Sequence, residues 1–213
     1  LLSFEVSYKM GMTRLKECIA WCDEAGIDYI TSWLLSRENL ERPIDELGPY
    51  FQVLNELFED LLIDDVVDNF TIQFIGSTDM LPEFLQKTIK QLKEVRGGGQ
   101  KTLTIALGYG GRQEILDAIK GLIDENRNEE NDFDSLIKNV TDEQLRQHLY
   151  SPDTPDIDLI IRTSGESRLS GFLLWQSAYS EVIFQDVYWP EFRKIDFLRC
   201  LREYTQRERR FGK

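Results

Sequence analysis

Residues 70–109, "FTIQFIGSTDMLPEFLQKTIKQLKEVRGGGQKTLTIALGY", decide the fold because they contain two strand patterns with one helix pattern between them. The first seven and the last nine residues are short apolar runs of the kind that forms strands. Residues 77–95 predict a helix that starts at a serine or threonine and ends before Gly97, Gly98 and Gly99. A strand, a helix and a second strand in succession indicate parallel strands covered by helices.

The same alternation continues outward in both directions. Leu15, Cys18, Ile19 and Cys22 have helical spacing and precede Gly26, a natural helix terminator. Further helices are predicted at residues 10–25, 42–66, 110–125, 141–150 and 194–212, and further strands at residues 27–35, 158–162 and 181–184. We find no internal repeat and no linker, so residues 1–213 are predicted to form a single α/β domain with a mainly parallel central sheet and helices on both faces.

Length and charge limit the classes of function. The chain has 213 residues, enough to bury a full core, and a formal net charge of −13. An acidic chain lacks the broad basic face that nucleic-acid binding needs, so we expect no nucleic-acid partner. An anionic substrate must instead be held by a local cluster of positive charge. No window of about 18 uncharged apolar residues occurs, so no transmembrane helix is predicted.

Cysteine and histidine usage argues against two common kinds of site. Cys18, Cys22 and Cys200 are odd in number and lack the paired spacing of metal ligands. We therefore expect reduced core thiols and a cytoplasmic location. The single histidine, His148, is expected on the surface, and without it no Ser/His/Asp triad can form.

The topology places the binding rim at the carboxyl ends of the parallel strands. Ser36, Asn39 and Arg42 follow the strand at residues 27–35, and residues 109–112 follow another strand end. Residues 162–170 follow the strand at residues 158–162. Polar residues from distant parts of the chain are therefore expected to meet at one edge of the sheet.

The chemistry expected at this edge is the binding of a phosphate group. Arg162 and Arg168 are six residues apart, and guanidinium groups donate paired hydrogen bonds to phosphate oxygens. Ser164 and Ser170 add hydroxyl donors. An equally weighted alternative is that the two arginines pair with neighbouring acids such as Asp158 and Glu166. Gly110 and Gly111 indicate a tight strand-to-helix turn, because no lysine follows as in a P-loop.

An apolar segment follows the arginines. Residues 172–175, "FLLW", are of a type that ordinarily forms core, but beside a phosphate site they would form the wall of an apolar cleft. Glu181 would hold Mg²⁺ together with substrate phosphates, although a single glutamate is more often a solvated surface charge. The residues alone thus predict that the protein binds an amphiphilic phosphate.

Four stretches together resemble the cis-prenyltransferases, the undecaprenyl diphosphate synthase family. The stretches are "LLSRENLERP" at 34–43, "GYGGRQEILDAI" at 108–119, "RTSGESRLSGFLLWQSAYSEVIF" at 162–184 and "RERRFG" at 207–212. The resemblance runs from about Tyr8 to the last residue. It implies the family's Rossmann-like fold, a homodimer, and a Mg²⁺-dependent enzyme that joins isopentenyl diphosphate to an allylic diphosphate. The reaction forms a Z double bond and releases diphosphate, and any membrane contact would be peripheral and made through the product only.

The resemblance also implies roles for single residues. Arg162, Arg168 and Ser170 would bind the diphosphate of isopentenyl diphosphate, and Glu181 would help coordinate Mg²⁺. Asn39 would act in catalysis.

The remaining implied roles concern the allylic substrate and the dimer. Arg42 would act in catalysis together with Asn39. Both residues would line the allylic diphosphate side, with Ser36 nearby. Arg210 and Gly212 match a terminal Arg-x-Gly that reaches across the dimer to the neighbouring diphosphate site.

One family motif is not found in residues 1–213. The family begins with a strand and then Asp-Gly-Asn-x-Arg, whose aspartate is the principal Mg²⁺ ligand and whose loop cradles the allylic diphosphate. Either this strand and loop lie outside the given sequence, or the chain is a non-catalytic subunit that supports a partner. The other catalytic features and the absence of a starting Met favour the first interpretation.

Two positions indicate the short-chain branch of the family. Tyr8, in "SYKMG", replaces a family histidine, and Leu34 stands where long-chain members often have a small residue facing the product tunnel. The chain therefore most resembles the (2Z,6E)-farnesyl diphosphate synthases, which extend geranyl diphosphate once. A longer-chain undecaprenyl or decaprenyl diphosphate synthase remains the alternative, as does a purely core role for Leu34.

Overall fold

A computed structural model describes residues 3–127, 137 and 140–207, and it contains the predicted strand–helix–strand unit. Strand β2 (Phe70–Ile75) pairs in parallel with β3 (Lys101–Tyr109), and α3 (Glu83–Val95) connects them. The predicted start of this helix at residue 77 is wrong. Pro82 occupies the N-cap, and because a residue before proline avoids the helical region, the chain forms a separate short turn at Thr78–Met80 before α3 begins.

All strand pairs are parallel, as predicted. Strand β1 (Tyr29–Ser36) pairs with the other side of β3, which gives the order β1-β3-β2. Strands β4 (Leu159–Arg162) and β5 (Glu181–Phe184) form a second parallel sheet. The predicted central sheet is thus divided in two within the described residues, because β1 and β4 do not pair with each other.

The remaining helices follow the predicted order with different ends. They are α1 (Phe4–Glu24), α2 (Ile44–Ile63), α4 (Gly111–Arg127), α6 (Asp142–Gln147) and α7 (Lys194–Gln206). Helix α1 starts six residues earlier than predicted, because Ser3 caps it by accepting a hydrogen bond from Val6 N. The last helix ends at Gln206, earlier than predicted, because the backbone of Arg207 is extended, and the rest of the predicted helix, residues 208–212, lies outside the described residues.

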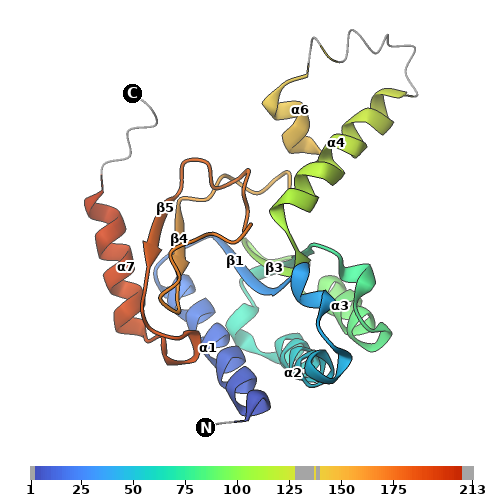
Figure 1. The fold of residues 1–213 in the computed structure, drawn as a ribbon. Helices are drawn as coiled ribbons and strands as arrows, with labels where there is room; N and C mark the ends of the chain where they lie inside the picture. The colour runs from blue at the N-terminus through green and yellow to red at the C-terminus, as the bar shows by residue number, and fades with distance from the viewer. Residues whose placement is uncertain (1–2, 128–136, 138–139, 208–213) are drawn as a thin grey trace.

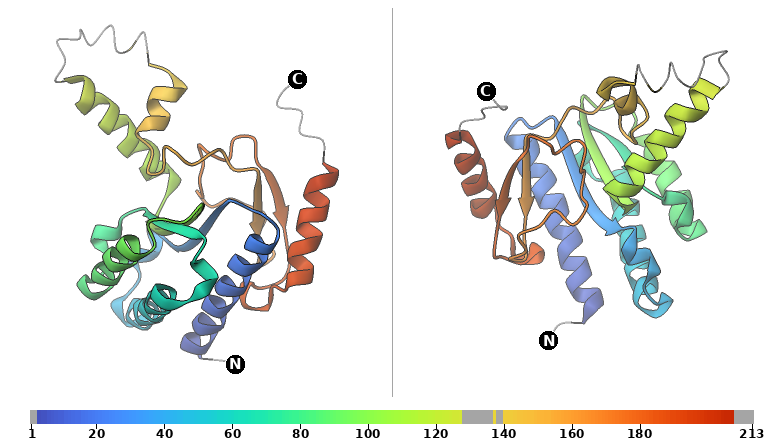
Figure 2. Two further views of the ribbon diagram at one scale, coloured as in Figure 1. Left: turned by 180° about the vertical axis from the view of Figure 1, so that it is seen from behind. Right: turned by 45° about the horizontal axis from the view of Figure 1, so that its top comes forward.

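Helices α1, α2 and α3 cover one face of the β1-β3-β2 sheet (Figure 1). Leu103, Ile105 and Leu107 point from alternate positions of β3 into this core. Helix α7 lies beside the β4-β5 sheet, and α4 and α6 extend away from the body of the molecule (Figures 1 and 2). The region between β1 and β4 is thus bounded by α1 among the helices, and no strand of the described residues lies between these two strands.

Helix α1 connects the two sheets. Its residues Leu15 and Ile19 belong to the main core, whereas Trp21 packs in a second cluster with Phe192 and Phe197. The ring centroids of Trp21 and Phe197 are 6.0 Å apart. Burying apolar side chains on both sides of one helix fixes the relative position of β1 and β4, between which the candidate site lies.

Substitution of Gly76 should destabilise the fold. Gly76 follows β2 with a φ of +100°, and a Cβ there would lie 2.2 Å from the Leu107 carbonyl oxygen. Gly76→Ala should lower the free energy of unfolding by at least about 1–3 kcal/mol, the usual cost of such backbone strain. Gly48 in α2 has open space around it, so Gly48→Ala should instead raise that energy by about 0.5–1 kcal/mol. Urea denaturation measures both, and changes of the same sign would contradict this account.

Candidate functional site

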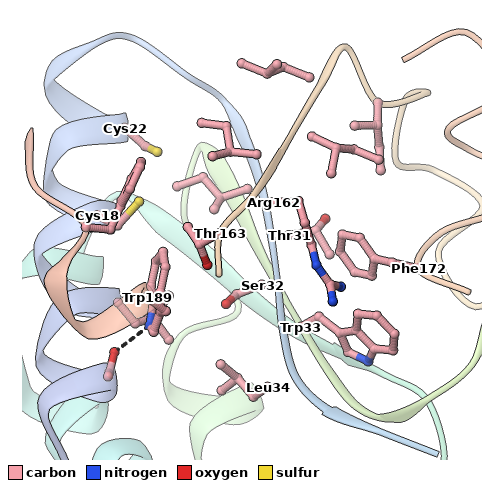
Figure 3. Close-up of a pocket in the computed structure, with 18 of the residues that line it drawn as sticks. Cys18, Cys22, Thr31, Ser32, Trp33, Leu34, Arg162, Thr163, Phe172 and Trp189 are labelled. Carbon is pink, nitrogen blue, oxygen red and sulfur yellow. Dashed lines mark hydrogen bonds between the residues drawn. The ribbon is translucent and has the colours of Figure 1, made fainter. Parts of the chain in front are cut away.

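A pocket of about 950 Å³ lies between β1, β4 and α1 (Figure 3). Every residue from 26 to 35 and from 154 to 164 lines it, so the pocket follows β4 along its full length and β1 as far as Leu35. Among the described residues, β1 pairs only with β3, and β4 only with β5. The pocket is therefore a groove between two open, parallel sheet edges.

Four of the predicted site residues line this pocket. Leu34 comes from β1, Asn39 and Arg42 from the short turn after β1, and Arg162 from the last position of β4. Their common location is what the carboxyl ends of parallel strands provide. The structure thus brings Arg162 together with Arg42 and the apolar side chain of Leu34, which precede it in the sequence by 120 and 128 residues.

The turn after β1 holds Arg42 in a fixed orientation. Asn39 N donates to Ser36 Oγ at 3.1 Å, which closes the turn. When the Asn39 side-chain amide is oriented so that both its nitrogen and its oxygen have hydrogen-bond partners, the nitrogen also donates to Ser36 Oγ at 3.2 Å. Its amide oxygen then accepts from Arg42 Nη2 at 3.0 Å and Nε at 3.2 Å. Two hydrogen bonds on one side of a planar guanidinium leave its other edge for an anion.

Arg162 extends from the end of β4 toward an aromatic wall. In Figure 3 its side chain lies beside Phe172 and Trp33. Those two rings stack with centroids 5.1 Å apart and an interplanar angle of 9°. All three residues line the pocket. A positive group at the edge of an apolar wall suits a ligand with a charged head and a hydrocarbon tail.

Arg168 and Ser170 do not line the pocket. The Arg168 side chain is 65% exposed and forms an ion pair with Glu166, which is one of the two outcomes left open by the sequence. Ser164, Ser170 and Leu173 in the same loop have positive φ values of 74°, 52° and 43°. Such backbone strain in non-glycine residues is found preferentially at functional sites.

The structure does not place Glu181 beside Arg162. Glu181 begins β5 opposite Leu159, whereas Arg162 pairs with Phe184, so about 10 Å of strand separates the two positions. The Glu181 carboxylate accepts a hydrogen bond from Arg207 Nη1 at 2.6 Å. The part of the chain that the structure describes contains no group of three or more acidic, histidine or cysteine side chains that could hold a metal ion. Arg210 and Gly212 lie outside the described residues.

Tyr50 was not identified from the sequence, although it lines the pocket. Its hydroxyl donates a hydrogen bond to the Leu34 carbonyl oxygen, and its ring meets Tyr8 edge-on at 4.7 Å. Burial raises the pKa of Tyr50 above its ordinary value of 10, so the hydroxyl remains a donor. The family resemblance singled out Tyr8, and the fold adds that Tyr8 packs against Tyr50, which holds the Leu34 backbone.

The three cysteines are free thiols, as predicted. Cys18 and Cys22 line the pocket from α1 (Figure 3). The hydrogen bond with Cys18, and then burial, raise the pKa of Cys22, so it stays protonated at neutral pH. Burial raises the pKa of Cys200 to about 11. Reactive nucleophilic thiols need a lowered pKa, so neither Cys22 nor Cys200 fits that role.

A parallel α/β fold with an apolar pocket and arginines at its rim defines a protein that holds an amphiphilic anion. Residues 2–212 match the family model described as putative undecaprenyl diphosphate synthase. The chain belongs to this undecaprenyl diphosphate synthase family and is therefore a cis-prenyltransferase, a prenyl-transferring enzyme of isoprenoid biosynthesis.

Relatives in this family carry different product names. Over 205 residues the chain is 45% identical to tritrans,polycis-undecaprenyl-diphosphate synthase (geranylgeranyl-diphosphate specific) of Picrophilus torridus, covering 95% of this chain and 79% of that protein. Over 210 residues it is 40% identical to (2Z,6E)-farnesyl diphosphate synthase of Mycolicibacterium smegmatis, covering 98% and 79%. Family membership therefore leaves the product length open.

A solved structure supports the fold directly. Lavandulyl diphosphate synthase from Lavandula x intermedia, in complex with dimethylallyl diphosphate, superposes with a TM-score of 0.89 at 27% identity, covering 100% of this chain and 90% of that one. The expected cis-prenyltransferase fold is thus confirmed. Within the described residues, none of the helices has the length and apolar character needed to span a membrane.

Proposed function

We propose that the protein condenses isopentenyl diphosphate with geranyl diphosphate to give (2Z,6E)-farnesyl diphosphate. The observation that carries this proposal is the shared pocket of Arg42, Arg162 and Leu34. Two cationic side chains suit two diphosphates, and a bulky leucine at the apolar wall limits the length of the hydrocarbon tail. The 40% identity to a relative named for this product supports the same conclusion.

In this scheme the two arginines hold different substrates. Arg42 lies on the allylic side with Asn39 and Ser36, which fix its guanidinium. Arg162 lies on the isopentenyl diphosphate side, and Arg168 and Ser170 in the following loop act on the same diphosphate. Binding both substrates in one pocket converts a bimolecular reaction into an effectively unimolecular one.

The reaction is an alkylation in which every atom is accounted for. The allylic carbon–oxygen bond breaks and diphosphate leaves with the electron pair. The double bond of isopentenyl diphosphate supplies the electrons for the new carbon–carbon bond, and the released diphosphate takes a proton from the adjacent carbon, whose C–H electrons form the new double bond. Arg42, already oriented by Asn39, stabilises the negative charge that develops on the departing diphosphate. The apolar wall of Trp33 and Phe172 excludes water from the electron-poor carbon.

Mg²⁺ fits Glu181 only in combination with substrate. The Glu181 carboxylate accepts a hydrogen bond from Arg207, so Mg²⁺ would have to displace or share that contact. Mg²⁺ usually takes one or two carboxylates plus substrate phosphates, so a single carboxylate is sufficient when a diphosphate completes the shell. When bound, Mg²⁺ would neutralise diphosphate charge.

We also infer that a further parallel strand pairs with the facing edges of β1 and β4 and leaves the end of the groove at Leu34, Arg42 and Arg162 to the substrates. The two facing edges run the length of the pocket, and open strand edges present backbone groups that require partners. The family strand that carries Asp-Gly-Asn-x-Arg is the proposed occupant, with its loop beside Asn39 and Arg42. A protein in which such a segment precedes residue 1 should show slower amide exchange in residues 29–35 and 159–162 than residues 1–213 alone. Unchanged exchange there would argue against this occupant.

Two other functions remain as alternatives. A longer-chain undecaprenyl or decaprenyl diphosphate synthase is favoured by the 45% identity to a relative of that type. A non-catalytic subunit that supports a partner is the second alternative. The free thiols support a reducing compartment, in line with our proposal of a cytoplasmic enzyme.

The test of the proposed function is a product assay on protein made from the complete gene. With Mg²⁺, geranyl diphosphate and labelled isopentenyl diphosphate, we expect a fifteen-carbon product whose formation stops with chelation and resumes when Mg²⁺ is restored. A long polyprenyl product would select the first alternative. Activity that appears only with a partner protein would select the second.

Leu34→Ala should lengthen the product. The Tyr50 hydroxyl holds the Leu34 backbone, so shortening this side chain opens space at the pocket wall without moving the strand. We expect chains of more than fifteen carbons, measured by chromatography of the dephosphorylated products. Leu40→Ala, which changes a residue that packs on the same core but does not line the pocket, is the matched control. A fifteen-carbon product from both variants would assign Leu34 to the core alone.

We propose that the homodimer forms through helix α4. Leu116, Ile119 and Ile123 are 52%, 41% and 39% exposed and lie on one face of this projecting helix (Figure 1). Exposed apolar stripes of this kind mark protein–protein contacts. Ile119→Glu should therefore shift the protein from dimer to monomer in analytical ultracentrifugation, whereas Lys90→Glu, a change at an exposed position of α3, should not. A dimer that persists in both variants would place the interface elsewhere.

A further inference from the structure

A buried carboxylate lies outside the pocket, in the first turn of α4. Glu114 is 1% exposed. Its carboxylate accepts hydrogen bonds from the Tyr109 hydroxyl, from Gln176 Nε2 at 3.1 Å and from the Tyr150 backbone N–H at 3.1 Å. These partners are uncharged, so several donors and the positive end of the helix dipole together offset the cost of burying the charge.

Glu114 reaches the arginine loop through two connections. Gln176, itself 4% exposed, donates its side-chain amide directly to the carboxylate. The Tyr109 hydroxyl donates to Glu114, and Tyr109 packs with Leu173 in one buried apolar cluster. Burial raises the pKa of Tyr109 above its ordinary value of 10, which keeps the hydroxyl protonated and able to donate to Glu114.

The turn that these connections hold is strained. Ser170, Gly171 and Leu173 have φ values of 52°, 88° and 43°, in a region that favours glycine. Gly111, at the start of α4, donates its backbone N–H to the Gly171 carbonyl oxygen at 2.8 Å. Strained residues persist only where the surrounding structure holds them, and here the first turn of α4 supplies that support.

We propose that Glu114 is a positioning residue for the isopentenyl diphosphate site. It holds residues 170–173 in their strained conformation and so fixes Ser170 and the path of the loop that carries Arg168. Glu114 does not touch the substrate and acts through Gln176 and Tyr109. This role rests on the proposed function, because it assigns the loop to the binding of isopentenyl diphosphate.

The variant Glu114→Gln tests the role with little change of shape. A glutamine would present an amide donor toward the Gln176 donor and lose one acceptor, so the turn should loosen. We expect amide exchange of residues 164–173 to accelerate by about tenfold or more, the effect of losing a hydrogen bond to a charged group. The dissociation constant for isopentenyl diphosphate, measured by calorimetry, should rise, and the constant for geranyl diphosphate should stay close to that of the parent protein.

Asp117→Asn is the matched control. Asp117 lies on the same helix and accepts a hydrogen bond from the Tyr150 hydroxyl at 2.6 Å, and its other partners are Gln113 and Lys120. This variant should leave both the loop exchange and the isopentenyl diphosphate affinity unchanged. Where Glu114→Gln fails to fold, Gln176→Met breaks the direct connection and is compared in the same way.

The outcomes separate the two proposals. Faster exchange confined to residues 164–173, with weaker isopentenyl diphosphate binding, supports the positioning role. Unchanged exchange in that loop, or acceleration spread equally over β2 and β3, overturns it, because Glu114 would then serve only general stability. If the parent protein binds no isopentenyl diphosphate, the proposed function fails, while the exchange comparison still decides whether Glu114 holds the turn.

Discussion

Arg162→Ala is expected to lower kcat/KM for isopentenyl diphosphate by about ten- to 150-fold. The side chain lies at the end of β4, inside the pocket and beside the Trp33–Phe172 stack, where it is shielded from water on one side. A hydrogen bond to a charged group at such a site contributes about 1.5–3 kcal/mol, and each 1.4 kcal/mol is a factor of ten. Steady-state kinetics with varied isopentenyl diphosphate measures the change.

Two further variants show whether the effect comes from the guanidinium. Arg162→Lys keeps the charge but loses the paired donors, so it should recover only part of the lost activity. Arg168→Ala should raise the KM for isopentenyl diphosphate by less than Arg162→Ala does, because its side chain is 65% exposed and already paired with Glu166. A larger loss for Arg168→Ala than for Arg162→Ala would place the diphosphate in the loop and outside the pocket.

The fold was predictable where the signal is local. The strand–helix–strand unit of residues 70–109 was recognised because each element carries its own hydrophobic period. The start of α3 was missed because the helix begins after Pro82, and the earlier residues Ser77 and Thr78, which looked like a helix start, lie outside it. The start of α1 was missed because its first residues, from Phe4 on, are largely exposed and lack an apolar stripe.

The site residues divide in the same way, into those that a local sequence signal predicts and those whose position depends on contacts distant in the sequence. Asn39, Arg42 and Arg162 directly follow or end a parallel strand, so the topology alone predicts that they share an edge. The location of Arg168 depends on a loop whose path is set by positive-φ residues. Glu114 was overlooked because its partners, 36 and 62 residues away, become neighbours only after the loop folds onto α4. Contacts of this kind leave no periodic signal in a sequence.

Arg42→Ala is expected to lower kcat by about 10²–10³, the usual effect of removing one preorganised donor from a developing negative charge. With the Asn39 amide oriented to satisfy both its ends, its oxygen accepts hydrogen bonds from Arg42 at 3.0 and 3.2 Å, so the guanidinium is oriented before any substrate binds. Asn39→Ala leaves the charge in place but frees it to rotate. We expect that variant to lose about tenfold in kcat, a smaller effect that arises through Arg42.

A double-mutant cycle distinguishes this arrangement from two independent roles. If Asn39 acts only by orienting Arg42, then Asn39→Ala has nothing left to disturb once Arg42 is alanine, and the double variant should match Arg42→Ala alone. Independent contacts with the substrate would instead give losses that multiply. Rapid-quench measurement of the chemical step in all four proteins supplies the comparison, and multiplicative losses would make Asn39 a catalytic residue that touches the substrate itself.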